Sequence, residues 1–357
     1  MVVLSLFDGI SCGYLALKRL KEHYNENYPS IDKYFASEIE STAIKIATTN
    51  NSDIIEIGDV TKVFYDKNTG YLQTENGSFY AGHIDLMIGG SPCTDFSTIG
   101  SQNGMSFEDI IILTLDDYLR YKTEGYKFKG ESYLFWEYLR LLYEIQPTYF
   151  LLENVLMSSK WRSVIDMSLG ENPIEIDSAL VSAQTRKRQY WTNIPNVSVP
   201  TDKHISLDDI LDVNADIKDC SQGIVVQKNM PKLVDKYGKI PLKFNAYNAT
   251  EVLDKACTLT KGSMVSSSCA TLLWVKTSNG VHTVKDGILD NEYPIELEDG
   301  QYNLRKLNLL EMERLQTLPD NYTAVDGVGA NSRSSCIGNG WTVDVIVHLL
   351  RNVRVKG

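Results

Sequence analysis

The chain has 357 residues, 43% of them hydrophobic, which is enough for about two globular domains with a sizeable core. Its formal net charge of −11 excludes a uniformly basic surface of the kind that nucleic acids attract. The six cysteines form no C-x-x-C pair, which disfavours zinc and a disulfide framework and favours a reducing cytoplasm. We expect neither a signal peptide nor a membrane helix, because the first residues lack a basic segment and no apolar run reaches roughly 18 residues.

The first sixty residues have the pattern of an α/β sheet. Short apolar runs predict strands at 2–7, 34–36 and 54–57, and helices are predicted from about residue 15 and over 42–50. Each strand is followed by a polar or glycine-containing turn, at 8–13, 37–38 and 58–59. Because parallel strands end at one edge of a sheet, these turns are expected to line a ligand site there.

The first turn, with Gly9 and Gly13, matches neither the dinucleotide fingerprint nor the phosphate-binding loop. A pocket for a nucleoside without a pyrophosphate fits this pattern, and S-adenosylmethionine is such a ligand. Glu38, which follows the second strand, is the usual partner of a ribose hydroxyl pair. The alternative is a turn in which glycine is required only for steric reasons.

A second edge feature is the stretch from Asp85 to Cys93. An apolar run at 85–88 predicts a buried strand, and Gly89-Gly90-Ser91-Pro92 predicts its sharp exit. Pro92 restricts the backbone there and holds Cys93 in a stiff turn. Cys93 is therefore a candidate nucleophile, although a small cysteine that merely packs remains the alternative.

The rest of the chain alternates similar elements with a more irregular region. Residues 105–130 look like an inserted helix and loop. A helix at 132–144 precedes a strand at 149–152 that ends in Glu153-Asn154-Val155. Strands at 174–182 and 189–193 flank a cationic turn, which is either solvated surface or an anion clamp. Residues 195–302 are polar and predict a second, smaller domain, and helices are predicted at 304–315 and 343–350.

In this order the motifs resemble the cytosine-5 DNA methyltransferase family over nearly the whole chain. The motifs that carry the resemblance are Phe7-Asp8-Gly9, Glu38, Asp59, Pro92-Cys93, Glu153-Asn154-Val155, Gln184-Thr185-Arg186-Lys187-Arg188, Arg314-Leu315-Gln316 and Gly338-Asn339. They are most similar to the animal de novo branch, while the Asn- and Lys-rich usage favours a bacterial or phage member. The resemblance implies a Rossmann-like, S-adenosylmethionine-dependent methyltransferase sheet with a smaller, irregular target-recognition domain. The expected domains are 1–194 (catalytic and cofactor-binding), 195–302 (target recognition) and 303–357 (a return to the catalytic domain).

The resemblance also implies the catalytic roles. The Cys93 thiolate would add to carbon 6 of cytosine, so that carbon 5 can attack the methyl group of the cofactor. Glu153, as a protonated carboxyl, would hold the ring nitrogen and the exocyclic amine, and Asn154 would fix that turn. Arg186 would contact the flipped nucleotide, and Arg188 would do the same or bind phosphate.

The implied cofactor site covers both ends of the chain. Glu38 would bind the ribose, Asp59 would accept from the adenine amine, and Phe7 and Ile39 would cover the adenine. The full predicted set is Phe7, Asp8, Gly9, Ile10, Glu38, Ile39, Asp59, Val60, Pro92, Asn339 and Trp341.

For DNA, the loop at 94–104 would close over a flipped base, with Ser97 nearby and Ile99 in the vacated space. Residues 228–261 carry seven lysines and are positively charged, so Lys228, Lys232, Lys243 and Lys261 are expected to meet phosphates. A lysine run is also the ordinary composition of a solvated face. Candidate base readers are Asn245, Asn248, Thr260 and Ser263.

The predicted function is therefore a DNA (cytosine-5)-methyltransferase that acts on a flipped cytosine in a short duplex site. Double-stranded DNA is the expected partner, and the cytoplasm of a bacterial or phage-infected cell is the expected location, with no membrane and no metal. A cognate restriction endonuclease and the oligomeric state stay open. The alternatives are an RNA cytosine-5 methyltransferase, which lacks support because its Cys-Phe-Thr signature is absent, and a non-catalytic DNA-binding homologue, which usually loses the cysteine or the glutamate.

Overall fold

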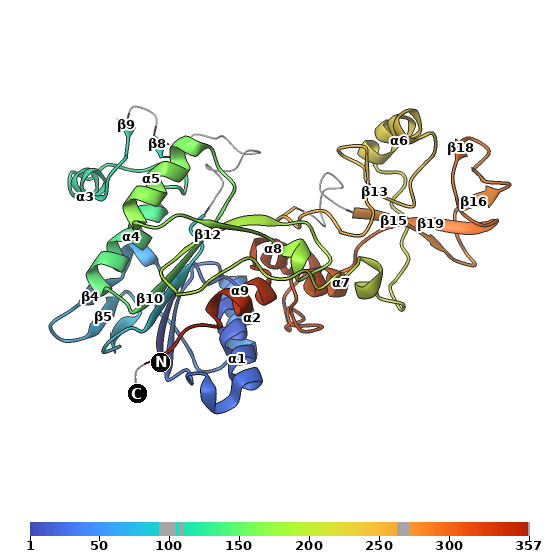
Figure 1. Cartoon of the computed structure of the whole chain (residues 1–357). Helices are drawn as coiled ribbons and strands as arrows, with labels where there is room; N and C mark the ends of the chain where they lie inside the picture. Colours follow the sequence, from blue (N-terminus) through green and yellow to red (C-terminus); the bar gives the residue numbers. More distant parts are fainter. Residues whose placement is uncertain (93–104, 108–109, 263–270, 356–357) are drawn as a thin grey trace. The chain divides into compact units, whose positions relative to one another are not determined.

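The computed structural model describes residues 1–92, 105–107, 110–262 and 271–355 (Figure 1). The chain forms two compact units. Unit 1 comprises Met1–Asp177, Lys187–Pro200 and Val343–Gly357, and unit 2 comprises Ser178–Arg186 and Thr201–Thr342. No helix in the part of the chain that the structure describes is long and apolar enough to cross a membrane.

Unit 1 is built on a seven-stranded sheet with the order β11-β12-β10-β7-β1-β2-β3. The strands are β1 (Val2–Leu6), β2 (Lys33–Ser37), β3 (Ile54–Glu56), β7 (Leu86–Gly89), β10 (Tyr149–Val155), β11 (Ile174–Asp177) and β12 (Lys187–Thr192). The five strands from β3 to β10 in this order pair in parallel, and β12 and β11 add antiparallel strands at the end. This arrangement confirms the predicted α/β sheet.

The helices of unit 1 are α1 (Cys12–Tyr24), α2 (Ser41–Asn50), α3 (Leu115–Thr123), α4 (Leu134–Ile145), α5 (Ser159–Leu169) and α9 (Val343–Leu350). The last helix, α9, packs against α1, which follows the first strand. Arg19 of α1 forms an ion pair with Asp344 at 2.8 Å, and the Tyr28 hydroxyl donates to the Leu350 carbonyl at 3.0 Å. The last helix of the predicted return segment 303–357 therefore packs on the first βα unit, whereas residues 303–342 of that segment belong to unit 2.

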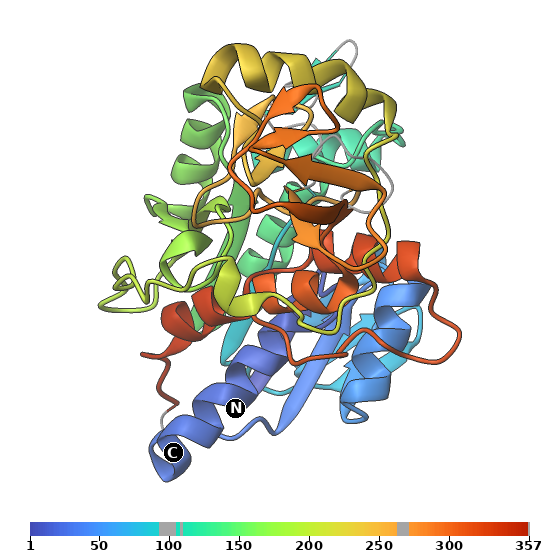
Figure 2. The ribbon, with the colours of Figure 1, turned by 90° about the vertical axis from the view of Figure 1, so that its right-hand side faces the viewer.

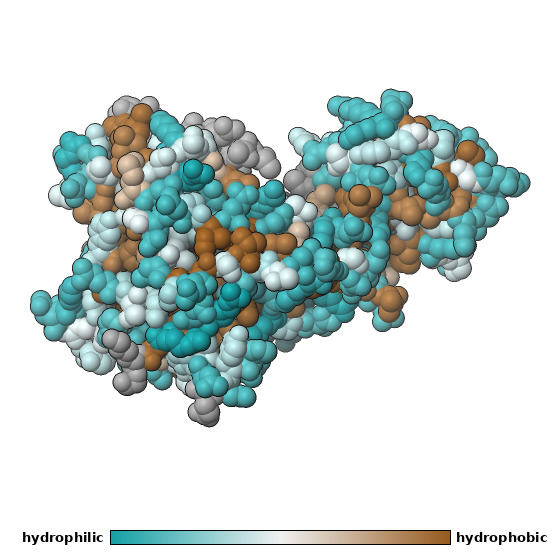
Figure 3. All heavy atoms as spheres, viewed as in Figure 1, coloured by the Kyte–Doolittle hydropathy of each residue, from teal (hydrophilic) through white to brown (hydrophobic). Residues whose placement is uncertain are grey.

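Two small sheets complete unit 1. One contains β4 (Phe64–Asp66), β5 (Tyr71–Thr74) and β6 (Gly77–Tyr80), and the other contains β8 (Ser106–Phe107) and β9 (Ile110–Ile111). A continuous hydrophobic core lies between the main sheet and α4, and includes the fully buried rings of Phe135, Trp136 and Trp191. The surface is mostly hydrophilic on the faces visible in Figure 3, where apolar side chains form scattered groups.

Unit 2 contains a second, antiparallel sheet with the order β14-β13-β15-β19-β16-β17-β18. Its strands are β13 (Lys243–Asn245), β14 (Thr250–Glu251), β15 (Thr271–Lys276), β16 (His282–Lys285), β17 (Ile288–Leu289), β18 (Tyr293–Pro294) and β19 (Gly300–Lys306). Helix α6 (Ile224–Tyr237) lies across these strands (Figure 2) and buries Val226, Met230 and Leu233 against them. The unit also contains α7 (Leu309–Leu315) and α8 (Ala330–Asn339).

Several predicted boundaries were wrong. The predicted strand 174–182 ends at Asp177, because Ser178–Leu180 forms a 3-10 turn closed by the Val181 amide. The predicted helix 304–315 begins only at Leu309, because Leu304 belongs to β19 and pairs with Trp274. Asn308 and Glu311 form a capping box that fixes this start. The unit boundaries also differ from the expected domains, since residues 303–342 belong to unit 2.

Candidate active site

The carboxyl ends of β1 and β2 bring the first two predicted cofactor turns together. The Glu38 carboxylate accepts the Gly9 amide at 2.8 Å through one oxygen, and the Ile39 and Glu40 amides at 2.8 and 2.9 Å through the other. Gly9 has a φ of 59°, and a Cβ at this position would meet nothing within 4 Å. Glu38 therefore closes the two turns against each other beside an open surface at Gly9.

The steric alternative for the glycines holds for one of them. A Cβ on Gly13 would lie 2.3 Å from Ile88 Cδ1, so any larger residue there would force the Ile88 side chain to move before α1 could pack on the sheet in this way. No such contact exists at Gly9, where the positive φ alone favours glycine. Gly13 thus allows α1 to pack closely on the sheet, and Gly9 leaves open space in the turn.

The Asp8 side chain is buried and is held by hydroxyl groups of unit 1. Its carboxylate accepts hydrogen bonds from Ser11 and, at 2.6 Å, from the Tyr34 hydroxyl. Burial raises the pKa of Asp8 to about 6. Burial also raises the pKa of Glu56, at the end of β3, to about 8, with the charges of Asp8 and Glu38 adding to the effect. Both carboxyl oxygens of Glu56 are buried without a hydrogen-bond partner, and no motif had marked this residue.

The third turn carries the predicted adenine acceptor. Asp59 starts the short 3-10 turn Val60–Lys62, and its Oδ1 accepts the Thr61 amide at 2.9 Å. The Asp59 amide donates to Glu75 at 2.8 Å, which ties the turn to the small β4–β5–β6 sheet. Val60 and Ile10 are buried and Phe7 is half-buried, whereas Ile39 is 75% exposed. An apolar side chain held in solvent beside Glu38, the predicted ribose partner, fits the stacking of a nucleobase.

The predicted nucleophile, Cys93, lies outside the described residues, as do Ser97, Ile99 and Ser263. The turn that leads to Cys93 is described up to the half-buried Pro92. Asn154, at the end of β10, donates through Nδ2 to the Ser91 hydroxyl at 3.1 Å, and its Oδ1 accepts the Val155 amide. Asn154 is 1% exposed. Asn154, which was expected to fix the turn at Glu153, is therefore also bonded to the chain two positions before Cys93.

Glu153 and Arg188 form an ion pair in unit 1, with 3.0 Å between Arg188 Nε and Glu153 Oε1. Arg188 pairs with Val155 across the β10–β12 ladder, so its side chain lies on the same face as that of Glu153. Both side chains are largely buried. The two predicted catalytic residues thus meet at the same sheet edge to which Asn154 belongs.

Arg186 belongs to unit 2 and is 4% exposed. Its guanidinium donates to the carbonyls of Leu259, Gly338 and Gly340 at 2.7, 3.2 and 3.0 Å. Gly338 is sterically required there, since a Cβ would lie 2.3 Å from the Thr260 carbonyl oxygen. The arginine thus joins two motifs far apart in sequence, and its contact with a nucleotide stays a prediction.

Asn339 and Trp341, the predicted cofactor residues near the chain end, flank Gly340 in unit 2. Asn339 is exposed and Trp341 is half-buried. Gln316, quoted only as part of a motif, donates to the Gly340 carbonyl at 2.9 Å and accepts from Gln184 at 2.8 Å. Sequence order alone gave no sign that these two glutamines meet.

The lysines predicted to meet DNA do not share one environment. Lys228 and Lys232 are exposed one turn apart on α6, and Lys261 is exposed, but Lys243 forms an ion pair with Asp208 at 2.6 Å. Lys255 donates instead to the carbonyls of Ala179, Ser182 and Ile205.

The candidate base readers also differ from one another. Asn245 is 4% exposed, and its Oδ1 accepts the Tyr247 and Asn248 amides, so it shapes a turn rather than facing outward. Tyr247, which no motif had marked, is 60% exposed on that turn.

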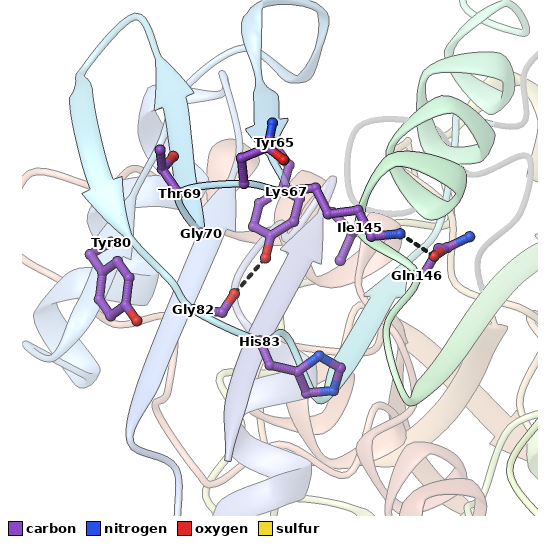
Figure 4. A pocket seen from close by; sticks show the side chains of 10 residues that line it. Tyr65, Lys67, Thr69, Gly70, Tyr80, Gly82, His83, Ile145 and Gln146 are labelled. Atoms are coloured by element: carbon purple, nitrogen blue, oxygen red, sulfur yellow. Dashed lines mark hydrogen bonds between the residues drawn. The ribbon is translucent and has the colours of Figure 1, made fainter.

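A polar pocket lies elsewhere in unit 1 (Figure 4). It is lined by residues of the small sheet and the end of α4, among them Tyr65, Lys67, His83 and Gln146. The Tyr65 hydroxyl donates to the Gly82 carbonyl at 2.6 Å across it. Gly82 and His83 precede β7, so this pocket is at the amino end of the strands, opposite to the edge that binds ligands in such sheets. Across the described ranges, no three His, Cys, Asp or Glu residues are grouped to hold a metal ion.

A model of the C-5 cytosine-specific DNA methylase family matches residues 1–114, 122–164 and 180–354. The chain belongs to this family. Members use S-adenosylmethionine as methyl donor, and the Glu38, Gly9 and Ile39 arrangement fits the nucleoside part of that cofactor. The family match leaves out 115–121, most of α3, so part of the predicted insertion at 105–130 lies outside the common pattern.

The chain is 33% identical over 156 residues to an orphan methyltransferase, M.Rho11sI, of Bacillus phage rho11s, a match covering 43% of this chain and 22% of that protein. It is 31% identical over 154 residues to the orphan methyltransferase M.SPRI of Bacillus phage SPR, covering 43% and 26%. The match thus spans about a quarter of these relatives' length.

Among solved structures, the Entamoeba histolytica methyltransferase EhMeth has a TM-score of 0.62 at 15% identity, covering 99% of this chain and 97% of that one. DNMT2 of Spodoptera frugiperda has a TM-score of 0.60 at 16% identity, covering 99% of both chains. These similarities confirm the fold class.

Proposed function

We propose that the chain methylates carbon 5 of a cytosine in duplex DNA through a covalent bond to Cys93. The observation that carries this proposal is the pair of consecutive residues at the end of β10. Asn154 holds the turn before Cys93, and Glu153 is paired with Arg188 at the same sheet edge. Attack on a cytosine ring requires a carboxyl and a thiol, and the end of β10 carries the carboxyl and contacts the turn that leads to Cys93.

The chemistry assigns a task to each group. The Cys93 thiolate forms a bond to ring carbon 6, and the electrons displaced toward the ring nitrogen are stabilised by a hydrogen bond from the Glu153 carboxyl, which acts there in its protonated form beside the Arg188 cation. S-adenosylmethionine supplies an electrophilic methyl group to carbon 5. Loss of the proton from carbon 5 then expels the Cys93 thiolate, so the products are 5-methylcytosine, S-adenosylhomocysteine and a proton.

The substrate is proposed as DNA because of the family and its relatives. The Bacillus phage relatives are named orphan methyltransferases, and we propose that this chain likewise acts without a partner endonuclease. Unit 2 is proposed as the target-recognition unit. Its support is the exposed pair Lys228 and Lys232, whose charge suits phosphates, and the exposed Tyr247 turn. A base within a duplex must leave the stack before Cys93 can reach it.

The test is transfer of a tritiated methyl group from S-adenosylmethionine to duplex DNA of mixed sequence and to RNA of the same sequence. We expect incorporation into DNA, and a loss on the order of a thousandfold or more for Cys93→Ser. Cys220→Ser is the matched control, because burial raises the pKa of the Cys220 thiol to about 11 and makes it a poor nucleophile. Equal incorporation by Cys93→Ser, or labelling of RNA alone, would refute the proposal.

A further inference from the structure

A buried charge cluster connects α3 with α4. Glu137 of α4 is fully buried, and its Oε1 accepts hydrogen bonds from the Tyr118 hydroxyl and the Lys122 ammonium of α3. Its Oε2 accepts Arg140 Nε at 2.9 Å and Nη2 at 2.7 Å. A buried carboxylate with four such donors is held in one orientation.

Arg140 extends this cluster to the third turn of the candidate cofactor site. Its Nη2 donates to the Val63 carbonyl at 2.8 Å and approaches the Val60 carbonyl at 3.4 Å. The Phe64 ring lies 5.0 Å from the guanidinium carbon and covers it. Arg140 therefore binds two backbone carbonyls of the turn that Asp59 begins.

The other side of this turn is held by Asp59 itself, which accepts the Thr61 amide at 2.9 Å. The direction of the Asp59 carboxylate thus depends on a short turn whose carbonyls are fixed by Arg140. Arg140 in turn is fixed by Glu137, and Glu137 by the two α3 side chains. Tyr118 is 1% exposed and belongs to the 115–121 segment that the family model leaves out.

We propose that α3 and the Glu137–Arg140 pair form a positioning device for adenine recognition. In this role Tyr118, Lys122, Glu137 and Arg140 act through the turn, by holding the Val60 and Val63 carbonyls so that Asp59 points at the adenine amine. The inference rests on the proposed function, in which Asp59 accepts that amine. A cluster that only stabilises helix packing would instead leave adenine discrimination unchanged.

The test uses two ligands that differ at the adenine amine, the group Asp59 is proposed to accept, and at the adjacent ring nitrogen, which gains a hydrogen. S-adenosylhomocysteine carries the adenine amine, and S-inosylhomocysteine carries a carbonyl there. In calorimetric titrations of the full chain, the wild type is expected to prefer the adenosyl ligand by at least about tenfold, since a hydrogen bond to a charged group is lost with the other. For Arg140→Lys, whose single ammonium cannot replace both Nε and Nη2 on Glu137 and also reach the Val60 and Val63 carbonyls, we expect the preference to fall to about threefold or less.

Two further variants separate positioning from folding. Tyr118→Phe removes one hydroxyl and keeps the aromatic packing, and it is expected to lower the adenosyl preference by about twofold. Glu144→Gln is the matched control. It alters the 2.7 Å contact between Arg140 Nη1 and Glu144 Oε1 and a longer contact of Oε2 with the Tyr65 amide at 3.4 Å, but leaves the Arg140 contacts with Glu137 and Val63 in place, so it should keep the wild-type preference. Circular dichroism before each titration confirms that the variants are folded.

The outcomes distinguish the two levels of the proposal. An unchanged preference in Arg140→Lys and Tyr118→Phe, or equal weakening of both ligands, would overturn the positioning role while leaving the proposed function standing. Failure of the wild type to bind either ligand would overturn the proposed function, and the positioning role with it.

Discussion

The two units use the polar side chains of their motifs differently. At the carboxyl edge of unit 1, Glu38 binds three backbone amides and leaves the neighbouring Ile39 exposed. In unit 2, Arg186 and Lys255 each bind three backbone carbonyls of that unit, and Asn245 is buried in a turn. At the edge of unit 1 the polar side chain thus fixes two turns beside an exposed surface. In unit 2 the polar side chains instead bind backbone groups inside the unit and hold its loops in place.

The largest expected effect tests the scaffold role in unit 2. Arg186→Met leaves the carbonyls of Leu259, Gly338 and Gly340 without this donor, so we expect a loss of about 3 kcal/mol in the free energy of unfolding. Urea denaturation followed by tryptophan fluorescence measures it. The exposed neighbour provides the control, Lys187→Met, which should stay within about 0.5 kcal/mol. A loss of the same small size in Arg186→Met would place the arginine outside the scaffold.

The next effect tests the cofactor edge of unit 1. Glu38→Ala removes the acceptor of the Gly9, Ile39 and Glu40 amides and the proposed ribose partner. We expect S-adenosylhomocysteine to bind about a hundredfold more weakly, measured by calorimetry. Glu40→Gln, at an exposed neighbouring carboxylate, should bind almost as the wild type does. Wild-type affinity in Glu38→Ala would contradict the site.

A smaller effect concerns pH. Burial raises the pKa of Glu56 from 4.5 to about 8, so the folded state favours the protonated carboxyl. Its stabilising contribution is full below pH 4.5 and is lost as the pH rises toward 8. Relative to Glu56→Gln, the wild type should lose about 1–2 kcal/mol of unfolding free energy across this window, because the side chain is only partly buried.

Urea denaturation at several pH values between 5 and 8 tests this dependence. The exposed carboxylate of Glu124 supplies the control, since Glu124→Gln should differ from the wild type by the same amount at every pH. If the difference in unfolding free energy between the wild type and Glu56→Gln is the same at every pH, Glu56 does not cause the pH dependence.

The smallest expected effect is on the salt dependence of DNA binding, which tests whether unit 2 contacts DNA. Replacing Lys228 and Lys232 by alanine should lower the slope of log affinity against log salt by about 2, because each phosphate contact contributes close to one. Lys243→Ala should change it less, since Lys243 is paired with Asp208. Fluorescence anisotropy of labelled duplex DNA between low and moderate salt gives the slopes. Equal slopes for all three proteins would exclude α6 from the interface.

The parallel sheet and its ligand edge could be predicted because local patterns determine them. The strand ends at Leu6, Ser37 and Glu56 were indicated by apolar runs that stop at polar turns. The pairing of Glu38 with Gly9 follows from this topology, since the carboxyl ends of adjacent parallel strands are neighbours.

The remaining features depend on contacts between distant residues, which a local pattern does not contain. Leu304 has the apolar spacing of a helix, but its pairing with β15 makes it a strand. The burial of Asn245 and the role of Arg186 arise from turns that meet only in the folded unit. Glu56 and Arg140 had no motif, and only their burial reveals them.

The central claim is that Cys93 bonds covalently to the target cytosine, and one measurement tests it most directly. Duplex DNA with 5-fluorocytosine in place of cytosine is incubated with the chain and S-adenosylmethionine, and the product is digested for peptide mass spectrometry. Because fluorine cannot leave carbon 5 as a proton does, the account predicts a stalled adduct on the peptide that contains Cys93. Methyl transfer to unmodified DNA together with no adduct, or an adduct at another cysteine, would contradict it.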